Sequence, residues 1–141
     1  MGMRADWVYR RGDLYLANLN PFKGSEQGGK RPVLVLQNNT GNLHSSTIIV
    51  AAITSQEKKK GQPTHYPLPP VGRLRMASMV QLEQIRTIDK CRVVEYLGKV
   101  PAENMRELNQ VIKVSLGMIR IPGNYKIGSS KAEEYACLRK E

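Results

Sequence analysis

Short apolar runs alternate with polar stretches rich in glycine and proline over the first hundred residues, a pattern typical of β-strands joined by turns. After a turn at 11–13, strands are expected at 14–19, 32–37, 47–54, 64–68, 76–88 and 92–97. The first strand should place Leu14, Leu16 and Leu19 on one face. The almost continuously apolar run at 47–54 predicts a strand buried on both faces. The polar stretch 38–46 is expected to be a loop.

The hydrophobic period changes after residue 100, where apolar positions recur with helical spacing. The residues on this predicted helix face are Met105, Leu108, Val111, Ile112, Ser115, Leu116 and Ile119. Pro101 suits the first turn of a helix, Gly117 would weaken its end, and Pro122-Gly123 would close it. Strands followed by one amphipathic helix predict a mainly β domain, a small and strongly bent sheet or barrel with the helix packed against it.

Three parts are expected along the chain of 141 residues, which is long enough for one hydrophobic core. Residues 1–10 should form a loosely held N-terminal arm, 11–121 the domain, and the glycine-, serine- and charge-rich stretch 122–141 a flexible tail. Cys91 and Cys137 are too few for a disulfide framework and lack the spacing of a zinc site. No apolar run approaches membrane-spanning length and no signal peptide is visible, so a cytoplasmic protein without membrane contact is expected.

Positive charge exceeds negative charge by a wide margin. The chain has 22 Lys and Arg against 12 Asp and Glu, a net charge of +10. Folding does not need such an excess, so a nucleic acid partner is favoured over a merely basic surface. Lys58, Lys59 and Lys60 would attract a phosphate backbone, although a charged run is more often a solvated loop. Aromatic residues make up only 6%, which argues against an extended base-stacking sheet.

The stretch 24–38 joins a glycine-rich polar loop to two adjacent cations and then to an apolar run. Pro32 fixes φ where the loop ends, and the glycines could turn backbone N–H groups toward an anion beside Lys30 and Arg31. The letters approach a Walker A motif, but Arg31 occupies the place of the magnesium-binding Ser or Thr, and a strand follows instead of a helix. An anion-handling loop is therefore expected, not a nucleotide site.

Four motifs in register carry a resemblance to a known family. They are Arg11-Gly12-Asp13-Leu14-Tyr15 followed by Gly24–Asn38, then Ile49–Thr54, Pro63-Thr64-His65 and Leu82–Asp89. Together they resemble the MazF/PemK toxin family over most of the chain. The resemblance implies a mainly β fold of five to seven strands, an SH3-like barrel of the CcdB/MazF type with a C-terminal amphipathic helix, assembled as a homodimer.

The same resemblance implies a function. It indicates a sequence-specific endoribonuclease that cuts single-stranded RNA with no metal or other cofactor and leaves 2′,3′-cyclic phosphate and 5′-hydroxyl ends. Such an enzyme is the toxin of a toxin–antitoxin pair, so an acidic antitoxin protein is the expected partner. Two other classes stay open, namely a CcdB-like gyrase poison and a non-catalytic nucleic-acid-binding module of the same fold.

Arg31 and Thr54 are the catalytic candidates. A guanidinium can grip two phosphate oxygens and does not titrate, while Thr54 matches the family's second active-site position. Each also has an ordinary structural reading, as an arginine at a strand start and a threonine at a strand end. Glu26 and Glu83 could act as acid or base, or could hold Arg31 or Arg86 in place.

The remaining candidates would contact RNA, because amide, hydroxyl and cationic groups read and hold splayed single strands. They are Ser25, Gln27, Gly28, Gly29, Lys30, Gln84 and Arg86. Arg86 could instead be structural and tie the strand end to Asp89. Some relatives place an arginine where this chain has Gln81, so the resemblance does not extend to a second catalytic arginine there. His44 and His65 invite a histidine mechanism, but nothing pairs them in sequence, and His65 looks architectural.

Overall fold

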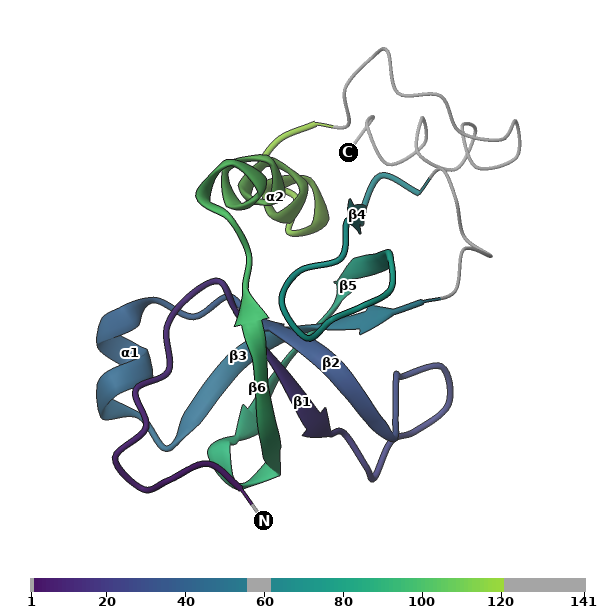
Figure 1. The fold of residues 1–141 in the computed structure, drawn as a ribbon. Helices are drawn as coiled ribbons and strands as arrows, with labels where there is room; N and C mark the ends of the chain where they lie inside the picture. The colour runs from purple at the N-terminus through teal and green to yellow at the C-terminus, as the bar shows by residue number, and fades with distance from the viewer. Residues whose placement is uncertain (1, 56–61, 121–141) are drawn as a thin grey trace.

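A six-stranded antiparallel sheet with the order β4-β5-β3-β2-β1-β6 forms the body of the protein (Figure 1). The computed structural model describes residues 2–55 and 62–120. The strands are β1 (Asp13–Asn18), β2 (Lys30–Val35), β3 (Thr47–Thr54), β4 (His65–Leu68), β5 (Ser78–Asp89) and β6 (Val93–Lys99). The other elements are the helices α1 (Asn39–His44) and α2 (Ala102–Ser115) and the 3-10 turn η1 (Lys90–Arg92). The prediction of a mainly β fold with one amphipathic helix near the C-terminal end is confirmed.

Alternation along the strands buries both faces of the sheet. One face forms the helix-side core, which packs against α2 and includes Leu14, Leu34, Ala51, Ile53, Leu82 and Leu108. The other forms the arm-side core, which includes Tyr9, Tyr15, Val33, Val50, Ala52 and Ile88. Leu14 and Leu16 share the helix-side core as predicted, but Leu19 lies in the arm-side core. That prediction was wrong because two-residue alternation places residue 19 on the face of Tyr15 and Ala17, opposite Leu14 and Leu16.

The N-terminal segment is packed on the sheet, so the prediction of a loose arm is wrong for its second half. Tyr9 is only 6% exposed, and the Trp7 ring lies 5.3 Å from that of Tyr96. Trp7 Nε1 donates to the Tyr15 hydroxyl at 2.8 Å, which donates to the buried Asp13 carboxylate at 2.6 Å. Burial and the Asp13 carboxylate raise the pKa of Tyr15 well above its ordinary value, so the phenol keeps the proton that it donates.

The stretch 38–46 contains the short helix α1, not only a loop. Asn38 caps the helix, since its side chain accepts a hydrogen bond from the Gly41 N–H at 2.8 Å. Asn42 is 1% exposed and donates to the Gln37 carbonyl at 2.8 Å. The prediction failed because one turn of polar residues has no hydrophobic period to reveal it, and Gly41 argues against a helix interior.

Helix α2 ends earlier than predicted. Gly117 adopts φ +73° and begins a Schellman motif, in which the Met118 N–H donates to the Lys113 carbonyl at 2.8 Å. Leu116 is therefore 60% and Ile119 40% exposed, although both were expected on the buried face. No helix within the described ranges is long and apolar enough to cross a membrane.

The turn between β4 and β5 folds back onto β6, at the opposite edge of the sheet. The Arg73 N–H donates to the Leu97 carbonyl at 2.7 Å. Gly72 adopts φ +54°, and a Cβ at this position would lie 2.5 Å from the Leu97 oxygen, so only glycine allows the approach. The turn residues thereby lie beside the ends of β2 and β3, with which they line one cleft.

Some predictions concern residues outside the described ranges. These predictions are the lysine run Lys58–Lys60, the tail 122–141 and Cys137. The domain bounds and the flexible tail therefore stay predictions.

Candidate functional site

Arg31 and Thr54 meet because β2 and β3 are neighbours. Their antiparallel register pairs Val33 with Ala52 and Leu34 with Ala51, and continuing it by two residues sets Arg31 opposite Thr54. Both line a cleft of 570 Å³, which we call the first cleft. Its other polar lining includes Gly28, Gly29, Lys30, Ser55, Arg73, Arg75 and Ser78. Two distant sequence motifs thus contribute to one site.

The Arg31 guanidinium is fixed at one nitrogen, since Nε donates to the Gly28 carbonyl at 2.7 Å. This bond ties the side chain to the end of the glycine loop, and Arg31 lines the first cleft. Thr54 is 8% exposed at the last position of β3. Arg31 and Thr54 thus line the same cleft, as their predicted catalytic roles require.

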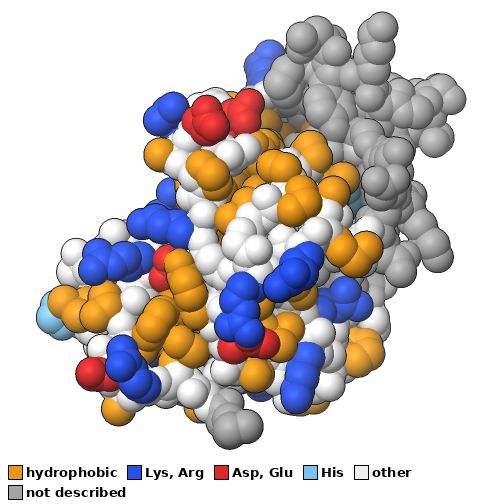
Figure 2. Space-filling model, in the orientation of Figure 1, with side chains coloured by type: hydrophobic (Ala, Val, Ile, Leu, Met, Phe, Trp, Pro, Cys, Tyr) orange, Lys and Arg blue, Asp and Glu red, His pale blue; other side chains and the backbone are white. Residues whose placement is uncertain are grey.

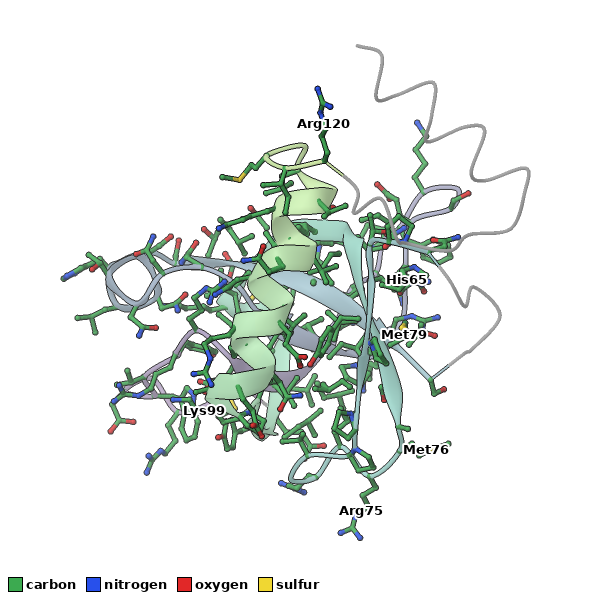
Figure 3. All side chains as sticks on the ribbon, turned by 90° about the horizontal axis from the view of Figure 1, so that it is seen from above. His65, Arg75, Met76, Met79, Lys99 and Arg120 are labelled. Atoms are coloured by element: carbon green, nitrogen blue, oxygen red, sulfur yellow. The ribbon has the colours of Figure 1, made fainter. Side chains whose placement is uncertain are left out.

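Arg73 and Arg75 add charge to the first cleft and were missed at the sequence level. Arg73 is paired with Glu95 at 3.0 Å, whereas Arg75 has no such partner within the described residues. Figure 3 shows Arg75 extending from the ribbon beside Met76, and Figure 2 shows more Lys and Arg than Asp and Glu on the face that it draws. No sequence signal identifies these two arginines, because only the packing of the turn on β6 brings them to the cleft.

The other predicted residues line a second cleft of 490 Å³. Its lining contains Ser25, Glu26, Gln27, Glu83, Gln84 and Arg86, together with Lys23 and apolar groups. The structure therefore divides the predicted RNA-binding residues into two sets. Gly28, Gly29 and Lys30 lie with Arg31 in the first cleft, and the amide and carboxylate side chains lie in the second.

The glycine-rich loop separates the two clefts and is closed at its base. The Leu19 N–H donates to the Gly29 carbonyl at 2.9 Å, and the Gly29 N–H donates to Asn20 Oδ1 at 2.8 Å. The Gln27 N–H donates to Gln84 Oε1 at 3.3 Å, which ties the loop to β5. These N–H groups hold the loop, so the prediction that backbone amides cradle an anion is wrong for Gln27 and Gly29.

The carboxylates Glu26 and Glu83 make no ion pair with Arg31 or Arg86. Glu26 Oε1 accepts from the Lys23 N–H at 2.6 Å, a hydrogen bond within the loop that stabilises its conformation. Glu83 accepts from two side chains and lies in an irregular part of β5. The alternative in which Glu26 or Glu83 holds Arg31 or Arg86 in place by an ion pair is therefore not supported.

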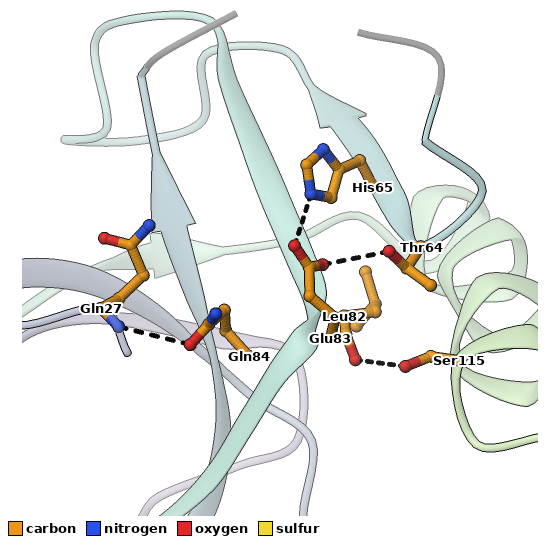
Figure 4. Close-up of polar contacts among 7 residues, drawn as sticks. All are labelled: Gln27, Thr64, His65, Leu82, Glu83, Gln84 and Ser115. Carbon is orange, nitrogen blue, oxygen red and sulfur yellow. Dashed lines mark hydrogen bonds and ion pairs between the residues drawn. The ribbon is translucent and has the colours of Figure 1, made fainter. Parts of the chain in front are cut away.

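A bulge in β5 presents Glu83 and Gln84 (Figure 4). Ala52 of β3 pairs with Gln81, but the preceding Ala51 pairs with Ile85, so residues 82–84 leave the ladder. Beside the bulge, Glu83 Oε2 lies 2.7 Å from His65 Nε2, and Glu83 Oε1 accepts from Thr64 Oγ1 at 3.1 Å. His65, for which the sequence indicates no partner, thus contacts Glu83 of the second cleft.

Opposing effects set the pKa of Glu83. Burial raises it, but the hydrogen bond from His65 and the other donors outweigh burial, and the pKa falls below its ordinary value of 4.5. Glu83 therefore remains a carboxylate near neutral pH, with both oxygens already accepting hydrogen bonds. A carboxylate with both oxygens occupied is better suited to orienting its neighbours than to acting as a general acid or base.

Arg86 and Arg92 hold the start of the loop. Arg86 Nη1 donates to the Leu19 carbonyl at 3.0 Å, and Arg92 Nη1 donates to the Asn18 carbonyl at 3.1 Å. Arg86 was expected to tie the strand end to Asp89, but Asp89 Oδ1 accepts from the Cys91 N–H at 2.8 Å. Arg86 thus makes a structural contact, as one of its two predictions had it, but the partner is the Leu19 carbonyl and not Asp89.

Neither Gln81 nor a group of metal ligands contributes to the site in the described part of the chain. Gln81 is 1% exposed and lies beneath the surface, so it cannot replace an arginine that contacts a ligand. Within residues 2–55 and 62–120, no three His, Cys, Asp or Glu side chains are grouped to hold a metal ion. Metal independence of the reaction stays a prediction for chelation to test.

Comparison with known proteins places the chain in a family. The family model described as PemK-like, MazF-like toxin of type II toxin-antitoxin system matches residues 10–116. The Endoribonuclease MazF of Staphylococcus saprophyticus is 50% identical over 112 residues, which cover 79% of this chain and 93% of that protein. A MazF crystal structure from Deinococcus radiodurans is 32% identical with a TM-score of 0.69, covering 80% of this chain and all of that one.

Solved complexes are also similar. A MazE-MazF structure from Deinococcus radiodurans is 31% identical with a TM-score of 0.64, covering 81% of this chain and 100% of that one. The chain belongs to the PemK-like, MazF-like toxin family of type II toxin–antitoxin systems. The family predicted from the four motifs is confirmed.

Proposed function

We propose that this chain is the toxin of a toxin–antitoxin pair and acts as a sequence-specific endoribonuclease on single-stranded RNA. The observation that carries the proposal is the meeting of Arg31 and Thr54 in one cationic cleft. The identity of 50% to a protein named Endoribonuclease MazF, over nearly its whole length, supports the same activity.

The reaction uses a nucleophile that RNA itself supplies. The ribose 2′-hydroxyl attacks the adjacent phosphorus and loses its proton, the bond from phosphorus to the 5′ oxygen breaks, and that oxygen takes up a proton. The products are a 2′,3′-cyclic phosphate and a 5′-hydroxyl. Negative charge grows on the non-bridging oxygens as the phosphorane forms, so preorganised donors at these oxygens lower the barrier.

Arg31 and Thr54 are assigned to these oxygens. The bond from Arg31 Nε to the Gly28 carbonyl orients the guanidinium before RNA arrives, which reduces the reorganisation needed during the reaction. Thr54, which lies opposite Arg31 when the β2–β3 register is extended by two residues, adds one neutral hydrogen bond to the same phosphate. Lys30 and Arg75 hold the neighbouring phosphates. Glu26 and Glu83 orient the loop and the second cleft.

The second cleft selects the RNA sequence. Ser25, Gln27, Gln84 and Arg86 offer hydroxyl, amide and guanidinium groups to the base edges of an unpaired strand. The loop between the clefts is held to both, through Gly28 on one side and Gln84 on the other. Recognition of a base can therefore align the neighbouring phosphate.

The partner is an acidic antitoxin protein, and the active form is a homodimer in the cytoplasm, where its messenger RNA substrate is found. The net charge of +10 would attract both RNA and an acidic antitoxin. The similar structures include MazE-MazF complexes. An acidic peptide over the first cleft would exclude RNA. Saturating antitoxin should then abolish cleavage, and a non-cleavable RNA should slow antitoxin binding.

The two other classes are less well supported. A CcdB-like gyrase poison and a non-catalytic binding module need no arginine fixed opposite a threonine in a cationic cleft. The relative at 50% identity carries the name of a ribonuclease.

Incubation with a long RNA in EDTA, followed by mapping of the new ends, tests the proposal. We expect cuts at one short sequence, with 5′-hydroxyl ends, and no cutting where the nucleotide before the cut carries a 2′-O-methyl group. Cleavage that requires magnesium and leaves 5′-phosphates would reject the mechanism.

A further inference from the structure

Phe22, the single phenylalanine of the chain, lies in the loop between β1 and β2 and is 53% exposed. Figure 1 shows this loop extending beyond the ends of the two strands. Within the described ranges, the tryptophan and the tyrosines all pack in or against one of the two cores. Phe22 is therefore the one aromatic ring of this part of the chain that neither core takes up.

The Phe22 ring packs against the backbone of Gly28. A Cβ atom at Gly28 would lie 1.9 Å from Cδ1 of the ring, so the ring occupies the space that any other side chain at position 28 would need. Gly28 lines the first cleft, and its carbonyl accepts from Arg31 Nε at 2.7 Å. The exposed ring thus contacts the same glycine that orients Arg31.

Hydrogen bonds hold the loop on both sides of Phe22. Before the ring, Asn20 Oδ1 accepts from the Gly29 N–H at 2.8 Å. After it, the Lys23 N–H donates to Glu26 Oε1 at 2.6 Å. Because the backbone is held before a ligand binds, a ligand that packs on the ring costs little conformational freedom of the loop.

An exposed ring beside a cationic cleft is suited to an unpaired RNA base. Every base has a π face, and stacking on an aromatic side chain holds a single strand without a particular hydrogen-bond pattern. The phosphates next to a stacked base would meet positive charge, because Lys30 and Arg31 line the first cleft and Lys23 follows the ring directly. These cationic surroundings favour a nucleotide over an apolar protein surface.

We infer that Phe22 stacks on one base of the bound RNA, adjacent to the phosphate that Arg31 and Thr54 hold. The inference rests on the proposed function of the first cleft. The stack adds affinity and fixes the path of the strand as it enters that cleft, without selecting a base by hydrogen bonds. One stacking ring is compatible with the low aromatic content, which argues only against an extended stacking sheet.

Variants of Phe22 are combined with altered RNAs to test the inference. The probes are RNAs of the cleaved sequence with a 2′-O-methyl group before the cut, either intact or lacking one base at successive positions, and affinity is measured by anisotropy. Phe22→Trp keeps a stacking ring, Phe22→Leu keeps an apolar group that can pack on Gly28, and Phe22→Ala removes both. Leu43→Ala is the matched control, because Leu43 is 61% exposed on α1 and lines neither cleft.

With the intact RNA, Phe22→Ala and Phe22→Leu should each weaken affinity about tenfold, the effect of losing one stack between a base and an aromatic ring. Phe22→Trp should keep most of the affinity, and Leu43→Ala should bind like the wild type. One of the abasic RNAs should bind the wild type more weakly and should lose little further affinity in Phe22→Ala, because both changes remove the same contact.

The inference is overturned if folded Phe22→Ala binds the intact RNA like the wild type, or if its loss of affinity is the same on every abasic RNA. Recovery by Phe22→Leu would overturn it in favour of packing on Gly28. Unchanged RNA affinity with weaker binding of the antitoxin or of a second subunit would overturn it in favour of a protein contact.

Circular dichroism and thermal melting report whether each variant is folded. If Phe22→Ala does not fold, Phe22→Leu decides on the same series of abasic RNAs. Failure of the wild type to cleave any RNA would instead reject the proposed function, so the two failures are distinguishable.

Discussion

The two clefts differ in the kind of polar group that they present. The first has arginine, lysine and threonine side chains over an apolar floor that includes Leu16, Ile53 and Leu97. The second has amides, carboxylates and one guanidinium, and thus both donors and acceptors. A phosphate needs only donors and positive charge, whereas bases are distinguished by patterns of donors and acceptors.

The same loop serves both clefts but contributes differently to each. To the first it gives the Gly28 carbonyl that orients Arg31. To the second it gives side chains, Ser25, Glu26 and Gln27. This difference is the basis of the proposed division of labour, with the chemical step in the first cleft and sequence selection in the second.

The largest expected effect is that of Arg31→Ala. Cleavage should slow by about a hundredfold or more, as when a preorganised oxyanion donor is removed. The rate is measured under single-turnover conditions, with Arg10→Ala as the matched control because Arg10 lines neither cleft. A normal rate in the Arg31 variant would show that the first cleft is not the active site.

Thr54→Ala should have a smaller effect. Loss of one neutral hydrogen bond to the phosphate predicts a rate decrease of about tenfold. Thr54→Ser keeps the hydroxyl and should retain most of the activity. Equal losses in the Ala and Ser variants would assign Thr54 to packing.

Arg75→Ala tests the contribution of the β4–β5 turn. Affinity for RNA should fall several-fold, and the log–log salt dependence should become shallower by about 0.7, the value for one phosphate contact on a single strand. Arg73→Ala is the comparison, because Glu95 already neutralises that side chain. The account of the turn is contradicted if Arg73→Ala reduces the salt dependence more than Arg75→Ala.

The smallest effect concerns Glu83 and pH. Its pKa is lowered in the folded protein, so its hydrogen bonds stabilise the fold above the ordinary value of 4.5 and are lost as pH falls through the lower folded value. The stability difference between wild type and Glu83→Gln should be about 1 kcal/mol or less near neutral pH and should shrink in acid. Denaturant titrations across this range measure it. A difference that grows in acid would have the wrong sign.

Periodicity predicted most of the fold. The apolar alternation located all six strands to within a few residues, and helical spacing located α2. Helix α1 escaped because NTGNLH has a single apolar residue, although Asn38 was a readable cap. The bulge of β5 escaped because the sequence from Ser78 to Asp89 reads as an unbroken strand and only the pairing with β3 reveals the shift.

The residues predicted for the site line two clefts, an arrangement that the sequence did not predict. The family resemblance supplied Arg31 and Thr54, and the register of β2 and β3 explains why they meet. The contact between His65 and Glu83 spans 18 residues and crosses from β4 to β5, so no local pattern announces it. The two clefts are separate because of the path of the glycine-rich loop, and the spacing of residues in the sequence does not reveal that path.

A single-turnover titration of Arg31→Ala and Gln84→Ala tests the division of labour most directly. Cleavage rates of one RNA are measured against enzyme concentration, which separates the maximal rate from the half-saturating concentration. Arg31→Ala should lower chiefly the maximal rate, and Gln84→Ala should raise the half-saturating concentration while keeping the maximal rate within about twofold. A Gln84→Ala variant that binds RNA normally but cleaves it as slowly as Arg31→Ala would contradict the account.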